Sequence, residues 1–409
     1  MLRSHTVAGA LTLSAAEAAA CSDEMPAVHG VHLLALWGGL RNAAGSEADT
    51  QRLCRVVASL PALHSLSTPG GRFARAYGLE VTPALTSLPL LARLDLAFAS
   101  VTQSDAAAVA LAVAGLPALT RLSLTSSPAA PDRGAGAQDF VPGLRCLSHL
   151  QYLNLSGWGQ TGAAGTELLA PTLGLLTALT ELHLLNHQCG DMGAEFLVPV
   201  LCKCMKLATL SLGWQLLELD GAEAIAPQLG RCSTLTRLEL NGNQLLVEGM
   251  MALAPALGHL SRLASLDLSC NYCGGEGAVA LAPALGRLPA LTSLDLGENE
   301  FGAAGATALA PALGSLLQLM ALRLEGNDIG DAGAAALAAP LGGLTALTTV
   351  DLTCNGIGTA GVQDLAPSLA RLTALKSWQL DGNEDEEEVA RVLHAAVPAC
   401  VWQACDLSR

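Results

Sequence analysis

The sequence predicts an α/β repeat array in which each unit supplies a short strand followed by a helix. Three observations predict it. A run of the form LxxLxLxxN recurs every 28 residues, as in Leu263–Asn271 and Leu291–Asn299. Leucine alternates with polar residues in this first half of the unit, which is typical of a strand. The second half spaces its apolar residues by three and four, which is typical of an amphipathic helix.

The repeat covers most of the 409 residues. Successive runs begin at Leu63, Leu91, Leu119, Leu150, Leu179, Leu207, Leu235, Leu263, Leu291, Leu319, Leu347 and Leu375, and a weaker unit begins near Val31. We therefore expect about 13 repeats of 28 residues over residues 31–383. Residues 1–30 are then an N-terminal cap or flexible segment, and residues 384–409 form a C-terminal capping helix and tail.

Each element within the repeat has its own signal. The asparagine at position nine suits a sharp turn, and stacked asparagines would form a ladder whose amides satisfy backbone groups of the turns. A glycine pair such as Gly302 and Gly305 suits the entry into the helix, by a positive φ or by close packing. A proline within most helical halves, such as Pro255, predicts short or kinked helices. Asn383 is also a candidate N-cap for the last helix, with Glu384–Glu388 in its first turn.

Composition excludes several classes of function. The net charge is −15, from 21 basic and 36 acidic residues, so general nucleic-acid binding is not expected. The longest apolar run, Ala106–Leu119, is too short to cross a bilayer, which needs about 20 residues, so no membrane span is expected. Twelve cysteines are too dilute for a disulfide scaffold and indicate reduced thiols in the cytoplasm, or in the nucleus. Residues 1–20 loosely resemble a cleaved targeting segment, and the alternative is a first helix or end cap.

The residues that carry chemistry elsewhere do not form a convincing reactive site here. Cys270 and Cys273 make a CxxC, but Cys273 takes a core position of the repeat, and no second CxxC follows at zinc-finger spacing. His183 and His187 lie near Cys189 without an accompanying carboxylate pair, so an exposed contact face is the better interpretation. We expect no catalytic residue, no cofactor and no metal.

The LxxLxLxxN runs and the GxxGAxxLAxxL second halves resemble the leucine-rich repeat family. The resemblance is to the long-repeat subtype of ribonuclease inhibitor, Ran GTPase-activating protein and the NOD-like receptors. It implies a horseshoe solenoid, with a parallel sheet on the concave face and helices on the convex face. The resemblance says little about function, because proteins of this fold have many different functions.

The strand pattern predicts which side chains face the concave side, because residues between the leucines point away from the core. In the middle repeats this set contains most of the aromatic side chains of a chain that is only 3% aromatic. The candidates for partner binding are Tyr152, Glu181, His183 and Trp214, with Trp158 in place of the ladder asparagine. Adjacent strands would bring them into one patch, and exposed aromatics are typical interface anchors.

The later repeats predict an acidic stripe on the same face. Its residues are Glu239, Asp267, Asp295, Glu298, Asp351 and Asp381, interrupted by Arg323 and offset by Glu325. Such a stripe would attract a basic partner. A solvated position that tolerates acidic residues would give the same pattern. Residues 126–140, an irregular insertion, are a further candidate contact.

The sequence thus favours a non-catalytic scaffold that binds a protein partner with its concave face. One alternative is a GTPase activator for a Ran-like small GTPase, which the resemblance implies, although no catalytic residue of that family can be matched here. A second is a ribonuclease-inhibitor-like protein that blocks a basic enzyme. The expected partner is a protein, either basic or a small GTPase, rather than nucleic acid or membrane.

Overall fold

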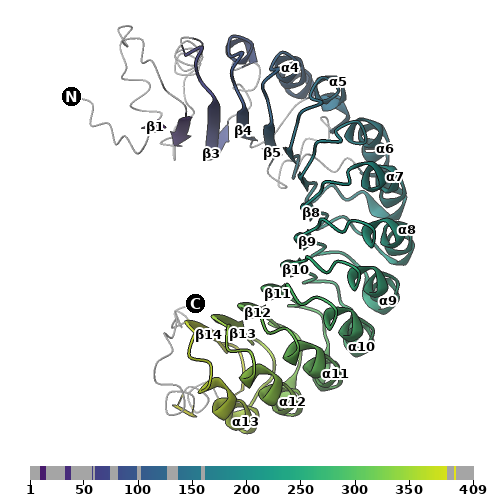
Figure 1. The fold of residues 1–409 in the computed structure, drawn as a ribbon, viewed down its shortest axis with the longest axis vertical. Coiled ribbons are helices and arrows are strands. Elements are labelled where there is room, and N and C mark those ends of the chain that lie inside the picture. The colour runs from purple at the N-terminus through teal and green to yellow at the C-terminus, as the bar shows by residue number, and fades with distance from the viewer. Residues whose placement is uncertain are drawn as a thin grey trace, which may run out of the picture. The chain divides into compact units, whose positions relative to one another are not determined.

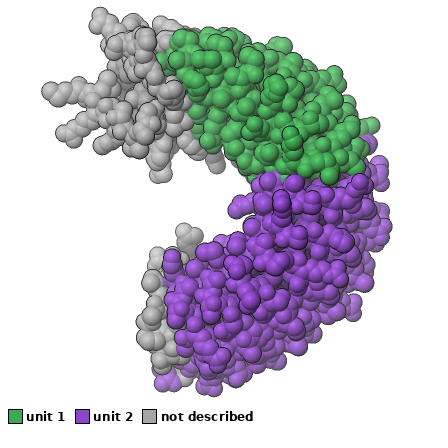
Figure 2. Space-filling view, viewed as in Figure 1, with its two compact units in different colours: residues 1–189, 199–207 green, residues 190–198, 208–409 purple. Residues whose placement is uncertain are grey.

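The computed structural model describes residues 10–14, 33–37, 58, 60–73, 82–98, 103–126, 137–157, 162–384 and 391–392. The chain divides into two compact units (Figure 2). Unit 1 comprises residues 1–189 and 199–207, and unit 2 comprises residues 190–198 and 208–409. Within each unit the strands lie side by side in one sheet and the helices lie behind it (Figure 1).

In unit 1 the strands follow one another in chain order, and each pairs in parallel with the next. They are β1 (Ala10–Ser14), β2 (Leu33–Trp37), β3 (Ser65–Phe73), β4 (Arg93–Phe98), β5 (Arg121–Ser126), β6 (Tyr152–Asn154) and β7 (Glu181–His183). The helical elements are α4 (Gln103–Ala114), the 3₁₀ turn η1 (Ala137–Phe140), α5 (Val141–Leu144) and α6 (Gly162–Leu173). Strand β1 precedes the first predicted repeat, so the sheet begins earlier than the sequence pattern indicated.

Unit 2 is the more regular of the two. Its strands are β8 (Thr209–Ser211), β9 (Arg237–Glu239), β10 (Ser265–Asp267), β11 (Ser293–Asp295), β12 (Ala321–Arg323), β13 (Thr349–Asp351) and β14 (Ser377–Gln379), parallel and in chain order. Its helices are α8 (Leu219–Leu229), α9 (Leu246–Leu257), α10 (Gly274–Leu285), α11 (Gly302–Gly314), α12 (Gly330–Gly342) and α13 (Thr359–Leu369). Helix α7 (Gly190–Lys203) contributes residues to both units.

The core lies between the sheet and the helices and is built from the repeat leucines. Leu238, Leu266 and Leu294 are paired across neighbouring strands and are at most 1% exposed. Their neighbours on either side in the strand face the other way and stay partly exposed, as the alternation predicted. One repeat buries its leucines only against the next, because the sheet and the helix layer each continue from repeat to repeat.

The predicted asparagine ladder is present. Each ladder residue is the ninth of its repeat, and its side chain joins two consecutive turns. The Asn327 Nδ2 donates to the carbonyls of Leu296 and Leu324, at 2.8 and 3.0 Å, while its Oδ1 accepts from the Asn299 and Phe301 amides. The same pattern recurs at Asn355. These bonds satisfy buried backbone groups that the turn would otherwise leave unpaired.

The ends of the predicted helices agree with the structure in part. Gly302 has φ of +61° and precedes a close contact at Gly305, where an added Cβ would lie 2.8 Å from Phe301. The helices of unit 2 are short, and Pro255 lies in the last turn of α9. Asn383, by contrast, is not free to act as an N-cap. Its amide is the last rung of the ladder, bonded to Asn355, Ile357 and two carbonyls.

Within the part of the chain that the structure describes, no helix combines the length and the apolar character needed to cross a bilayer. The capping helix expected after Glu384 falls almost wholly outside the described residues, as does most of the 126–140 insertion.

Candidate functional site

In each unit the face of the sheet away from the helices carries the third and fifth residues of the described repeats, most of them partly exposed, although Ser123, Ser211 and Asp351 are buried. These two positions flank the buried fourth residue, as in β7, where Glu181 and His183 are half-buried and Leu182 is 1% exposed. Register pairing stacks the same position of successive repeats, so Tyr152 lies beside Glu181 and Asp267 beside Asp295. The third and fifth positions therefore make two parallel rows of side chains that can contact a partner.

In unit 1 the rows bring four side chains into one cluster. The Arg121 guanidinium lies 4.1 Å from the centroid of the Tyr152 ring, close enough for a cation–π contact. The same guanidinium bonds the Glu181 carboxylate through Nη1 and Oε1 at 3.1 Å. The Tyr152 and His183 rings follow at 5.3 Å between centroids, tilted by 44°. We call Arg121, Tyr152, Glu181 and His183 the sheet cluster.

The sheet cluster is held in place before any partner arrives. Arg121 is fixed by both a ring and a carboxylate, and strand pairing fixes the backbone of each member. Tyrosine and arginine lose little rotamer freedom when already packed, which favours binding. The sequence prediction placed Tyr152, Glu181 and His183 correctly on one face but omitted Arg121. The sequence did contain a signal for Arg121, because it is the third residue of its repeat and is therefore paired with Tyr152 of the next strand.

Two other predicted members of this patch are Trp158 and Trp214. Trp158 lies outside the described residues. Trp214 belongs to unit 2 and sits in the loop after β8, beyond the strand. Its indole lies against Gly242 of the next loop, where an added Cβ would lie 2.4 Å from the ring.

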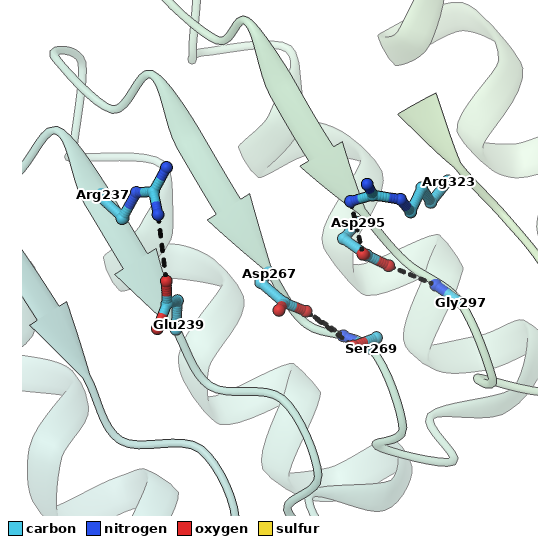
Figure 3. A network of polar contacts seen from close by, with 7 residues as sticks. All are labelled: Arg237, Glu239, Asp267, Ser269, Asp295, Gly297 and Arg323. Atoms are coloured by element: carbon cyan, nitrogen blue, oxygen red, sulfur yellow. Dashed lines mark hydrogen bonds and ion pairs between the residues drawn. The ribbon is translucent and has the colours of Figure 1, made fainter. Parts of the chain in front are cut away.

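In unit 2 the fifth-position row carries Glu239, Asp267 and Asp295, which Figure 3 shows, and Asp351, whereas the predicted Glu298 and Asp381 lie in the loops after their strands. Glu239 pairs with Arg237 of its own strand at 3.4 Å, and Asp295 pairs with Arg323 of β12 at 3.3 Å. Asp267 accepts from the Ser269 amide and hydroxyl, at 3.0 and 2.7 Å. Glu239 and Asp295 are thus partly neutralised, and each of the two arginines is about half exposed.

The carboxylates of unit 2 are less exposed than the sequence suggested. Asp351 is 9% exposed, and Glu325 is half-buried. Burial, with repulsion from Asp295 and Asp351, raises the pKa of Glu325 to about 7. Burial and the neighbouring Asp267 likewise raise the pKa of Asp295, although the Gly297 amide and Arg323 oppose the change. A cation near Glu325 and Asp295 would therefore be favourable, and further negative charge there would not.

The histidine and cysteine groups have structural roles. The sequence pattern predicted that His187 belongs to an exposed contact face, and this prediction is wrong. His187 is 3% exposed, occupies the ladder position, and donates from Nε2 to the Leu155 carbonyl at 2.7 Å. Burial lowers its pKa to about 4. Cys273 is fully buried, as predicted, and burial raises its pKa to about 12, which makes it unreactive.

Metal binding has no support in the described part of the chain, where no group of three or more histidine, cysteine, aspartate or glutamate side chains is arranged to hold an ion.

Comparison with known proteins agrees with this architecture. A family model described as leucine-rich repeat matches residues 231–254, 260–282, 288–310, 319–338 and 343–366. The crystal structure of an internalin from Listeria monocytogenes is similar in fold, with 18% identity and a TM-score of 0.52, over 90% of this chain and 86% of that chain. A search of curated proteins finds no significant match. The leucine-rich repeat fold is therefore confirmed, while the narrower resemblance to the ribonuclease inhibitor subtype stays a prediction.

Proposed function

We propose that this leucine-rich repeat solenoid is a non-catalytic scaffold that binds a protein partner on the exposed face of its sheet. The observation that carries the proposal is the sheet cluster. An arginine stacked on a tyrosine, next to a histidine and paired with a glutamate, is the composition that interface hot spots favour. Rigid strands present these groups at fixed spacing, so little ordering remains to be done on binding.

The acidic row of unit 2 supports a partner with basic groups facing Glu239, Asp267 and Asp295. These carboxylates lie in register on three adjacent strands. Repulsion from Asp267 contributes to the raised pKa of Asp295, so an added positive charge beside these two carboxylates is favourable. Complementary charge would chiefly raise the association rate and the choice of partner, and would weaken with salt.

The test compares the partners captured by three forms of the full chain under identical native conditions. The first is wild type, the second is Tyr152→Ala/His183→Ala, and the third is Leu111→Ala. Leu111 is 74% exposed on helix α4 and is a matched control away from the sheet. All three must unfold at the same temperature. Loss of one protein from the double variant alone supports the proposal, and identical capture by all three contradicts it.

GTPase activation and ribonuclease inhibition can each be distinguished from simple binding by the ratio of this chain to its target at which an effect is seen. A GTPase activator would accelerate GTP hydrolysis by a Ran-like GTPase when present at a small fraction of its concentration. A ribonuclease-inhibitor-like protein would block a basic ribonuclease only at equal concentration. The scaffold proposal expects neither effect from the purified chain.

A further inference from the structure

The loops after β8, β9 and β10 expose large apolar side chains, in contrast to the charged loops that follow them. The side chains are Trp214, Leu216, Leu219, Leu246 and Tyr272, with exposed fractions of 48%, 40%, 37%, 48% and 50%. We call these five residues the rim patch. All belong to unit 2 and lie beyond the strands, so the rim patch shares no residue with the sheet cluster.

Hydrogen bonds between consecutive turns hold the three loops side by side. The Trp214 amide donates to the Asn241 carbonyl at 2.8 Å, and the Gly242 amide donates to Ser269 at 2.9 Å. The Leu246 amide donates to Asn271, the residue before Tyr272, at 3.1 Å. The indole of Trp214 crosses from the first loop onto the second. The backbone of the loops that carry the rim patch is therefore hydrogen-bonded from one repeat to the next over three repeats.

The backbone of these loops is unfavourable for the residues that it carries. Positive φ values of 56°, 61°, 53° and 54° occur at Trp214, Leu216, Leu246 and Tyr272. Leu246 occupies the repeat position at which Gly274, Gly302 and Gly330 have φ of 62°, 61° and 62°. A branched side chain in this region is strained, because its Cβ crowds the backbone. The loop after β11 shares the left-handed residues at positions eight and ten, as at Glu298 and Glu300, so the strain peculiar to these loops is that at Leu246. Because the Leu246 side chain is 48% exposed, burial offsets only part of that strain, which points to a use for the side chain at the surface.

A defect in the ladder lies beneath the same loops. Asn271 is fully buried, and its Nδ2 donates to three carbonyls. Its Oδ1 has no hydrogen-bond partner, although the equivalent oxygens of Asn243 and Asn327 each accept from two amides of the preceding turn. An unsatisfied buried acceptor is costly, so the β9 loop is the less firmly held of these turns. That loop carries Leu246, at the middle of the rim patch.

Negative charge borders the rim patch on the side of the following repeats. Glu298 and Glu300 are exposed in the next loop, after β11. The pKa of Cys270, which lies in the same loop as Tyr272, is raised by partial burial and by four nearby carboxylates, of which Glu298 is the strongest. The field at the edge of the rim patch is therefore negative, and an apolar ligand with cationic groups on one side would complement both features.

We propose that the rim patch, with Glu298 and Glu300 at its edge, binds a peptide segment of a partner protein that carries aromatic or aliphatic side chains next to Lys or Arg. The apolar side chains of the segment would cover Trp214, Leu246 and Tyr272, and its basic side chains would lie toward the β11 loop. A second copy of this chain is a poor occupant, because its net charge is −15. Anionic membrane surfaces are disfavoured for the same reason.

The test begins with selection of random 12-residue peptides, displayed on phage, against the full chain. The proposal expects enrichment of peptides that combine Trp, Phe or Leu with Lys or Arg. Binding of one enriched, fluorescently labelled peptide is then measured by anisotropy. Trp214→Ser/Tyr272→Ser is expected to weaken it by roughly tenfold or more. Glu298→Gln/Glu300→Gln is expected to weaken it by a smaller factor that shrinks as salt rises.

Three further variants separate loss of binding from unfolding and from effects elsewhere on the chain. Leu246→Gly removes an apolar side chain and relieves strain, so weaker peptide binding with equal or higher stability cannot come from unfolding. Leu317→Ser, at a 62% exposed position outside the rim patch, should leave binding unchanged. Tyr152→Ala/His183→Ala should also leave it unchanged, which separates this inference from the proposed function.

Several outcomes would overturn the proposal. Enrichment of acidic peptides, absence of any enrichment, or equal binding by wild type and Trp214→Ser/Tyr272→Ser would each contradict it. Sedimentation equilibrium that shows a wild-type dimer, lost in Trp214→Ser/Tyr272→Ser, would instead assign the rim patch to a second copy of the chain.

Discussion

Two sets of loops in unit 2 share one backbone plan and differ in what they display. The loops after β11 and β12 place Glu298, Glu300 and Asp328 at left-handed positions, with glycine at the start of each following helix. The loops after β8 and β9 place Trp214, Leu216 and Leu246 at left-handed positions. Both sets are tied to a buried ladder residue. The ladder thus fixes the turn in both sets, while the residues at its exposed left-handed positions range from acidic to large and apolar.

The largest expected effect is on the ladder itself. Asn327→Ala removes bonds to five backbone groups and should lower the free energy of unfolding by roughly 3–5 kcal/mol. Asn271→Ala should cost about 1–2 kcal/mol less, because its Oδ1 satisfies no donor. Urea unfolding of both variants measures the difference. Equal losses would mean that the two turns are held alike and that the missing bond to Asn271 Oδ1 does not weaken the β9 loop.

A smaller effect concerns pH in the charged loops. Glu325 follows β12, and its pKa is raised to about 7, so the folded state favours the protonated form. The stability contributed by that form is lost as the pH rises from about 4.5, the ordinary pKa, through about 7. Glu325→Gln should therefore unfold at a higher temperature than wild type at pH 8 and show less change between pH 5 and pH 8. Solvent screening of this half-exposed group keeps the effect modest.

Thermal unfolding at pH 5 and pH 8 measures this effect, with Glu300→Gln as a control that changes the net charge equally at an exposed site. If Glu325→Gln and Glu300→Gln give the same pH dependence, the effect comes from overall charge and not from the buried carboxylate.

The smallest effect is on the backbone at the helix entry. Leu246→Gly should raise the free energy of unfolding by about 1 kcal/mol, because glycine adopts the left-handed conformation without strain. Gly302→Ala should lower it by about 1 kcal/mol, because space around the new Cβ is open and only strain changes. Chemical denaturation gives both values. A loss of stability in Leu246→Gly would show that Leu246 packs usefully, and would remove one argument for the rim patch.

The fold was predictable because its signals repeat. One period, one leucine pattern and one asparagine position define the strand, the core and the ladder, and each recurs often enough to exclude chance. The predictions that were wrong concern residues that fit two different roles in the repeat. Asn383 fits both an N-cap and a ladder rung, and His187 fits both a contact residue and a rung. An alignment of the repeats already indicates the ladder position, because Asn383 and His187 are each the ninth residue of their repeat.

The candidate site was only partly predictable. Position in the repeat places Tyr152 beside Glu181, but the stacking of Arg121 on Tyr152 depends on side-chain rotamers that the pattern does not specify. The left-handed conformation of Leu246 was hidden because leucine is ordinary in this sequence, and only the glycines at the same repeat position reveal it. The raised pKa of Glu325 depends on burial by neighbouring turns, which no local pattern records.

The ladder also sets the unit in which this chain can change length. Its bonds join residues that are 26, 28 or 31 positions apart, and each turn uses the same donors and acceptors as the next. Insertion or removal of one whole repeat leaves every remaining rung with an equivalent neighbour. A change of any other length would put the donors and acceptors of neighbouring turns out of step. Evolution can thus lengthen or shorten the contact surface in steps of 28 residues while the turns stay as they are.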